Sequence, residues 1–217
     1  MRALLVKEDR LAASPLSRLF LVFCAMTMLP GYPILTGAVF VCLGLFYSVQ
    51  GVKENRDVLY TLLLPVTRAE AVRAKFSFCI RIEAVGFGIM AALTVLRLTL
   101  LRNFGPYVNN ALMPANPVFL GFVLLIFAVF HRIFLCGFFK TAADAGGPFL
   151  RFFIAALLLV GAGEALHRLP FLRILAETGL RPLLVQSGVL LVCMLLYFLL
   201  TRAAISRSIK RFEALEF

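Results

Sequence analysis

The sequence predicts an all-α membrane protein, a single domain of six transmembrane helices with both termini in the cytoplasm, and not a soluble enzyme. Hydrophobic residues make up 62% of the 217 residues and charged residues only 15%, which leaves too little charge to cover a soluble domain. The mean hydropathy is +0.96, and the charges are bunched between long uncharged runs, as expected where hydrocarbon is the solvent. The basic residues flank these runs unevenly, which indicates the orientation.

Six apolar runs are the expected transmembrane helices. They cover residues 15–29, 34–50, 82–101, 117–139, 148–166 and 182–201. The first two are short, because an α-helix rises about 1.5 Å per residue and the hydrocarbon core is about 30 Å thick. We therefore expect this pair to form a shallow hairpin. Residues 1–13 alternate leucines with charges, which predicts an amphipathic helix on the membrane surface, and the tail 202–217 is basic and amphipathic.

The distribution of basic residues predicts that both termini lie inside. With an internal N-terminus, the inner segments hold 17 of the 22 basic residues. The outer segments hold the remaining five, which are Arg97, Arg102, Arg168, Arg173 and Arg181. Cytoplasmic loops carry such an excess of Lys and Arg, and six spans return the chain to the side on which it began.

Composition also argues against several other classes of protein. A net charge of +11 would suggest a nucleic-acid partner in a soluble protein, but here the basic residues flank apolar spans and face anionic lipid. The five cysteines lie inside apolar runs without a C-x-x-C pair, so they indicate neither disulfides nor a metal site. No catalytic nucleophile with a base beside it is apparent.

The polar segment between the second and third runs is the most informative part of the sequence. Leu59, Leu62 and Leu63 share one face of a short predicted helix, which Pro65 ends. Thr67-Arg68-Ala69-Glu70 has the pattern of a capping box, so a new helix is expected to begin near Arg68 and run into the third span. The pattern thus predicts a short cytoplasmic helix held against a transmembrane helix.

At these residues the chain resembles a known family. Leu63-Leu64-Pro65-Val66-Thr67-Arg68 is similar to the cytoplasmic loop of ATP-binding-cassette (ABC) type-2 permeases, the membrane subunits of one class of ABC exporters. The N-terminal amphipathic helix is similar to the elbow helix of that family. Three further stretches resemble its small six-span bacterial branch, and with the loop they cover most of residues 1–150: Pro30-Gly31-Tyr32-Pro33, Asn109-Asn110 with Met113-Pro114-Ala115-Asn116, and Phe138-Phe139-Lys140-Thr141.

The resemblance implies the transmembrane permease subunit of an ATP-driven exporter in the bacterial cytoplasmic (inner) membrane. Such a subunit pairs with a second permease, identical or related, and with ABC ATPase subunits that bind ATP and Mg²⁺. It implies a peptide, drug or lipid-like substrate and a coupling loop at 53–75 that docks on the ATPase. The coupling residues would be Glu54, Arg56, Asp57, Tyr60, Leu63, Leu64, Pro65, Thr67 and Arg68. The sequence has no G-x-x-x-x-G-K-[S/T] motif, so we expect no ATPase site and no directly bound cofactor in this chain.

Two charged residues fall inside the predicted spans, where an unpaired charge is costly. Glu83 and Arg132 lie in the inner halves of spans three and four, so they are a candidate interhelical pair; the alternative is that each extends to the interface. For His131 we expect a hydrogen bond within the bundle rather than a metal. Two other functions stay open: the substrate-binding membrane subunit of a vitamin importer, and a small membrane enzyme acting alone.

Overall fold

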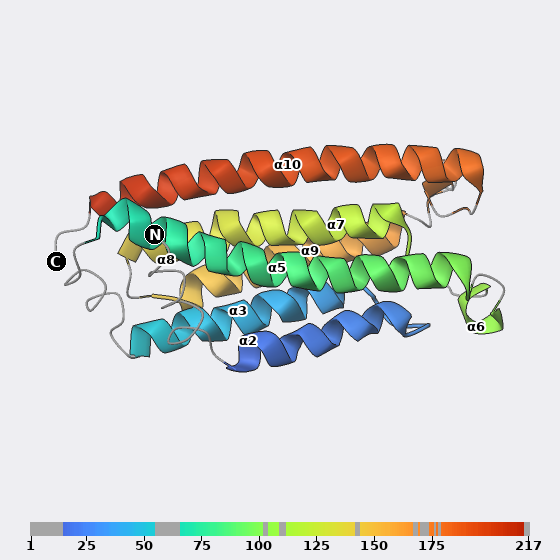
Figure 1. Ribbon diagram of the computed structural model, residues 1–217, viewed down its shortest axis with the longest axis horizontal. Helices are drawn as coiled ribbons and strands as arrows, with labels where there is room; N and C mark the ends of the chain where they lie inside the picture. The colour runs from blue at the N-terminus through green and yellow to red at the C-terminus, as the bar shows by residue number, and fades with distance from the viewer. Residues whose placement is uncertain are drawn as a thin grey trace.

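The computed structural model is an elongated helical bundle (Figure 1). It describes residues 15–54, 66–101, 104–108, 112–141, 144–166, 169, 174–175, 177 and 179–214. Within these ranges the regular elements are all helices, as the sequence predicts. In chain order they are α2 (Pro15–Leu19), η2 (Phe20–Met28), α3 (Thr36–Glu54), α5 (Arg68–Thr99), α6 (Gly105–Val108), α7 (Pro117–Val129), η3 (Phe130–Leu135), α8 (Cys136–Thr141), α9 (Gly146–Leu166) and α10 (Leu180–Glu213).

Each of the six predicted apolar runs is helical in the structure. Among the described residues, four helices are long and apolar enough to cross a membrane: α5, the continuous segment Pro117–Lys140, α9 and α10. The first two runs form shorter apolar helices, Pro15–Met28 and Thr36–Gly51. Successive runs point in opposite directions, so α2 begins and α10 ends at the same end of the bundle (Figure 1). The amphipathic helix predicted at 1–13 lies outside the described residues.

The first apolar segment is mostly a 3-10 helix, which the sequence did not indicate. The five-residue α2 is followed by nine residues of η2. A 3-10 helix rises about 2.0 Å per residue against about 1.5 Å for an α-helix, so the segment extends to about 25 Å instead of about 21 Å. This stretching brings the short first run closer to the thickness of a hydrocarbon core of about 30 Å.

Two helices are much longer than the predicted spans. The helix predicted to start near Arg68 does run without a break through the third span, over 32 residues to Thr99. The sixth span and the basic tail form one helix of 34 residues, α10. At about 1.5 Å per residue both exceed a core of about 30 Å. The start of α5 and the end of α10 lie together at one end of the bundle (Figure 1). We call this the basic end because these segments carry Arg68, Arg73, Lys75, Arg202, Arg207, Lys210 and Arg211.

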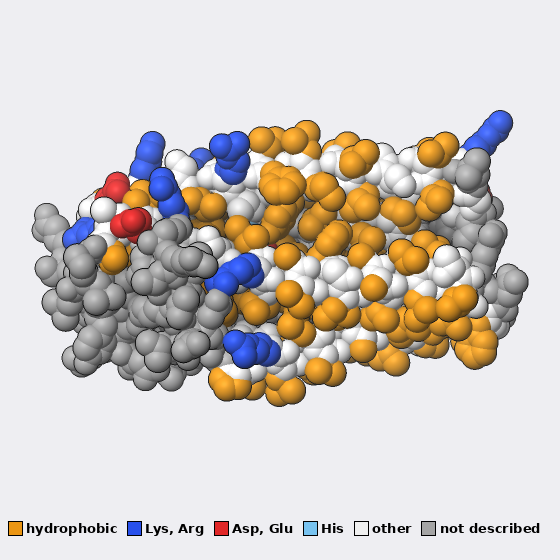
Figure 2. All heavy atoms as spheres, in the orientation of Figure 1, with side chains coloured by type: hydrophobic (Ala, Val, Ile, Leu, Met, Phe, Trp, Pro, Cys, Tyr) orange, Lys and Arg blue, Asp and Glu red, His pale blue; other side chains and the backbone are white. Residues whose placement is uncertain are grey.

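The surface of the bundle is divided into an apolar middle and a basic end. On the face in Figure 2, hydrophobic side chains cover the middle of the bundle, and most Lys and Arg side chains lie toward the basic end. The segment α7–η3–α8 is the most enclosed of the four long helices, whereas α9 and α10 expose leucine and phenylalanine side chains. The arrangement is that of a protein whose middle is solvated by hydrocarbon.

Phenylalanine rings and small residues hold the helices together. Phe46 of α3 stacks on Phe149 of α9 with ring centroids 4.1 Å apart. Gly86 lies close to η2 and α3, where a glycine allows close helix packing, whereas Gly88 faces open space. The first two runs approach each other closely at Gly44, where an added Cβ would lie 2.8 Å from Cβ of Phe20.

Candidate functional site

The start of α5 is built by the capping box that the sequence predicts. Thr67 is the N-cap, with extended backbone, and its hydroxyl oxygen accepts a hydrogen bond from the Glu70 backbone N–H at 3.2 Å. In return the Glu70 carboxylate accepts a hydrogen bond from the Thr67 backbone N–H at 3.0 Å. Each residue thereby satisfies a backbone donor that the helix itself leaves free, which sets where the helix begins.

Arg68 ties this helix start to the last turn of α10. Its guanidinium donates hydrogen bonds to the backbone carbonyls of Phe212 at 3.3 Å and Glu213 at 3.0 Å. The last carbonyls of a helix have no partner within the helix and carry partial negative charge, so an arginine is well suited to them. Arg211 of the same turn donates to the Cys136 carbonyl at 2.9 Å, where α8 begins. The basic end is therefore a junction of α5, α8 and α10.

A second group of polar side chains lies buried in the middle of the bundle. Glu83 of α5 and His131 of η3 are 1% and 0% exposed. Glu83 Oε1 lies 3.0 Å from His131 Nε2, and Glu83 Oε2 accepts a hydrogen bond from the Tyr197 hydroxyl at 3.0 Å. His131 Nδ1 is 2.9 Å from the hydroxyl oxygen of Thr201. We call these four residues the buried polar network; it joins α5, η3 and α10.

The two contacts of the Glu83 carboxylate differ in kind. The tyrosine contact is a directed hydrogen bond, whereas Glu83 Oε1 and His131 Nε2 are close without the alignment of one. Their attraction is therefore that of neighbouring charges or dipoles, which is strong in a low-dielectric interior. Removing one member leaves the other buried without compensation, which is destabilising. The network thus fixes the relative positions of three helices.

The histidine reaches the network from an irregular turn. Phe130–Leu135 is a π-helical turn between α7 and α8, and such single turns are rare and frequent at functional sites. Phe76 packs against the imidazole with ring centroids 5.5 Å apart. Among the described residues, no group of three His, Cys, Asp or Glu side chains is placed to hold a metal ion.

A comparison with protein families identifies the family of this chain. The model of a family described as ABC-2 family transporter protein matches residues 4–210 of the 217-residue chain. The chain belongs to the ABC-2 transporter family. Its membrane location and transport role follow from that membership and from the apolar helices, so it is a multi-pass membrane component of a transporter. Neither a curated protein nor a solved structure matches this ABC-2 transporter chain.

The predicted coupling residues of this ABC-2 chain lie at the end of α3, at the start of α5 and in the sequence between them. Glu54 is the last residue of α3, and Thr67 and Arg68 form the start of α5 described above. The remaining coupling residues lie outside the described residues: Arg56, Asp57, Tyr60, Leu63, Leu64 and Pro65. Both flanking helix ends lie at the basic end (Figure 1).

The structure gives Glu83 a different partner from the one predicted. The carboxylate contacts His131 and Tyr197, and no contact with Arg132 is found among the described residues. Adjacent residues of a helix point in very different directions, about 100° apart in an α-helix. Because His131 faces the bundle interior, Arg132 is turned away from it and is half-buried. The expectation that His131 is hydrogen-bonded within the bundle agrees with its contact to Thr201.

Tyr197 and Thr201 were missed by the sequence analysis. They are four residues apart, so they share one face of α10, and each is a polar residue inside an apolar run. That spacing is the signal that could have found them. Their partners lie on other helices and far away in the chain, however, and spacing along one sequence contains no information about such pairs.

Proposed function

We propose that this chain is the transmembrane permease subunit of an ATP-driven exporter, powered by a separate ABC ATPase. In this proposal the chain has six spans, its termini and basic end face the cytoplasm, and it resides in a bacterial cytoplasmic membrane. The partner ATPase binds ATP and Mg²⁺. Membership of the ABC-2 transporter family supports the transport role, and the excess of basic residues at one end supports the orientation.

The observation that carries the proposal is the junction at the basic end. The segment at 55–65 connects α3 to α5, and α5 begins with a capping box and an arginine bonded to α10. A partner docked on this segment would therefore bind just before the first turn of a continuous 32-residue helix. A movement applied there is carried along α5 without a flexible joint.

The buried polar network provides the next step. Glu83 lies 15 residues beyond Arg68 on the same helix, about 22 Å along its axis. A displacement of α5 moves the Glu83 carboxylate and, through it, Tyr197 of α10 and His131 of η3. Small sliding movements of packed helices against one another are a known form of domain movement. A second permease subunit, identical or related, would complete the pathway for a peptide, drug or lipid-like substrate.

Co-purification from the native cells tests the proposal. The tagged chain, solubilised in mild detergent, is expected to retain an ABC ATPase that mass spectrometry identifies by its nucleotide-binding motif. Asp57→Arg and Leu64→Asp are expected to lose the ATPase at least tenfold while the chain itself stays folded. Arg68→Ala tests the junction and is expected to reduce ATP-dependent transport in vesicles.

A matched control is available on α10. Arg207 is exposed, and no hydrogen bond or ion pair of its side chain is found among the described residues, so Arg207→Ala is expected to leave ATPase retention and transport unchanged. Purification of a stable chain without an ATPase, or with a tightly bound vitamin, contradicts the proposal. An equal effect of Arg68→Ala and Arg207→Ala would contradict the role of the junction while leaving the ATPase partner in place.

A further inference from the structure

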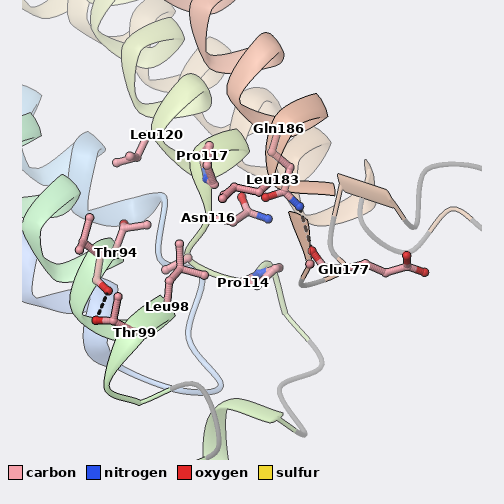
Figure 3. A pocket seen from close by; sticks show the side chains of 13 residues that line it. Thr94, Leu98, Thr99, Pro114, Asn116, Pro117, Leu120, Glu177, Leu183 and Gln186 are labelled. Atoms are coloured by element: carbon pink, nitrogen blue, oxygen red, sulfur yellow. Dashed lines mark hydrogen bonds between the residues drawn. The ribbon is translucent and has the colours of Figure 1, made fainter. Parts of the chain in front are cut away.

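A pocket lies between the far ends of α5 and α10, opposite the basic end. It has a volume of about 540 Å³ and is lined by α5, by the segment leading into α7, and by the start of α10. Figure 3 shows Thr94 and Leu98 of α5 on one side and Leu183 and Gln186 of α10 on the other, with Pro117 between them. Its volume falls within the range of small-molecule pockets, about 300–1,000 Å³.

The pocket has a buried floor and an apolar rim. Thr94, Ala115 and Asn116 of its lining are at most 4% exposed, whereas Val95 and Leu183 are 59% and 42% exposed. The rim residues therefore belong both to the pocket and to the hydrophobic outer surface of the bundle. A molecule dissolved in the hydrocarbon of a membrane can enter without crossing a polar surface.

The polar groups of the floor are committed to internal hydrogen bonds, with one exception. The Asn116 side chain donates to the Leu175 carbonyl at 2.7 Å and accepts from the Phe119 backbone N–H at 3.0 Å. Gln186 is 2% exposed, and its Nε2 donates to the carbonyls of Ile174 and Glu177 at 3.2 and 3.0 Å. Because both partners are acceptors, the amide nitrogen must face them, and the oxygen Oε1 points elsewhere.

Among the described residues, no donor to Gln186 Oε1 is found, and this oxygen is not one of the fully enclosed atoms without a partner; it is therefore open to a donor in the pocket that Gln186 lines. An amide oxygen carries two acceptor lone pairs, so this atom can accept a hydrogen bond from a molecule in the pocket. Among the described lining residues, the only carboxylate is that of Glu177, which points away from the pocket in Figure 3, and none is Lys, Arg or His. A charged ligand group would therefore be desolvated without a counter-charge, which is costly.

We propose that this pocket binds an uncharged single-chain amphiphile, such as a long-chain alcohol. Its hydroxyl donates a hydrogen bond to Gln186 Oε1, and its hydrocarbon chain lies against Leu98, Leu120 and Leu183. The ligand separates α5 from α10 at this end, while Glu83–Tyr197 and Arg68–Phe212 join the same helices elsewhere. The proposal requires no ATPase and stands independently of the exporter function.

Photolabelling of the purified chain in phosphatidylcholine nanodiscs tests the site. The probe is dodecanol carrying a diazirine on its chain, and the labelled residues are mapped by mass spectrometry. Labels are expected to concentrate at residues 94–99 and 183–186. Unlabelled dodecanol is expected to compete at least fivefold more effectively than dodecane, which lacks the hydroxyl, or dodecanoate, which carries a charge.

Substitutions provide a second, independent test. Ala115→Trp fills the pocket floor and is expected to reduce labelling at least fivefold. Ala84→Trp is the control, at an exposed position of α5 about 15 Å from Thr94 toward the basic end, and is expected to leave labelling unchanged. Labels spread evenly over the lipid-facing helices, or equal competition by the three compounds in the unsubstituted chain, overturn the proposal. The competition arm needs no variant, so a misfolded Ala115→Trp chain does not leave the site untested.

Discussion

Replacing Tyr197 by phenylalanine removes one hydroxyl group from the buried polar network and leaves the ring packing in place. Tyr197 is 8% exposed, and its hydroxyl donates to the Glu83 carboxylate at 3.0 Å. In the variant, Glu83 Oε2 loses the only hydrogen bond that the described residues give it. The change therefore removes a hydrogen bond and leaves a buried acceptor unsatisfied.

Two magnitudes bear on the expected loss. Interhelical hydrogen bonds in a membrane protein contribute about 0.6 kcal/mol on average and at most about 1.7 kcal/mol, whereas hydrogen bonds to charged groups in proteins contribute about 1.5–3 kcal/mol. The Tyr197–Glu83 hydrogen bond belongs to both groups, because it joins two helices and its acceptor is a carboxylate. The two ranges overlap at about 1.5–1.7 kcal/mol. We expect Tyr197→Phe to reduce the free energy of unfolding by about 1.5 kcal/mol.

Equilibrium unfolding in mixed micelles, followed by circular dichroism, measures this loss. Tyr47→Phe is the matched control, because Tyr47 is 38% exposed and its hydroxyl has no hydrogen bond among the described residues; a change below about 0.3 kcal/mol is expected. In a double-mutant cycle with Glu83→Gln, the two substitutions are expected to couple by about 1 kcal/mol. Equal effects of Tyr197→Phe and Tyr47→Phe, with no coupling to Glu83, would refute the reasoning.

Three further predictions concern helix ends and packing, and the same unfolding measurement checks each. Thr67→Ala removes the N-cap of α5 and is expected to cost about 1 kcal/mol, with Thr67→Ser retaining most of that stability. Gly44→Ala places a Cβ 2.8 Å from Cβ of Phe20 and is expected to cost about 1–3 kcal/mol. Gly88→Ala meets open space and is expected to stabilise the protein by about 0.5–1 kcal/mol. A Gly88→Ala variant less stable than Gly44→Ala would contradict the packing. Arg97→Leu removes the 2.6 Å hydrogen bond from Arg97 to the Thr27 carbonyl and is expected to cost about 2 kcal/mol, and an unchanged stability would show that this contact does not hold η2 to α5.

The sequence by itself determined that hydrocarbon surrounds this protein and where two of its helices, α5 and α7, begin. Long uncharged runs can be stable only in hydrocarbon, so the helical class follows from composition. Local motifs set the helix starts: Thr67 with Glu70 begins α5, and Asn116 before Pro117 begins α7, where its side chain caps the Phe119 N–H. These signals are readable because a cap joins residues only three positions apart.

The tertiary structure alone decided which polar residues meet. Glu83 was predicted to pair with Arg132 but contacts the neighbouring residue His131, which faces the bundle interior from a π-helical turn. The partners Tyr197 and Glu83 are 114 positions apart, and the pocket at Gln186 is assembled from three separate segments. Spacing along a helix predicts what one face carries, whereas the choice of a partner depends on how the faces of different helices are brought together by packing.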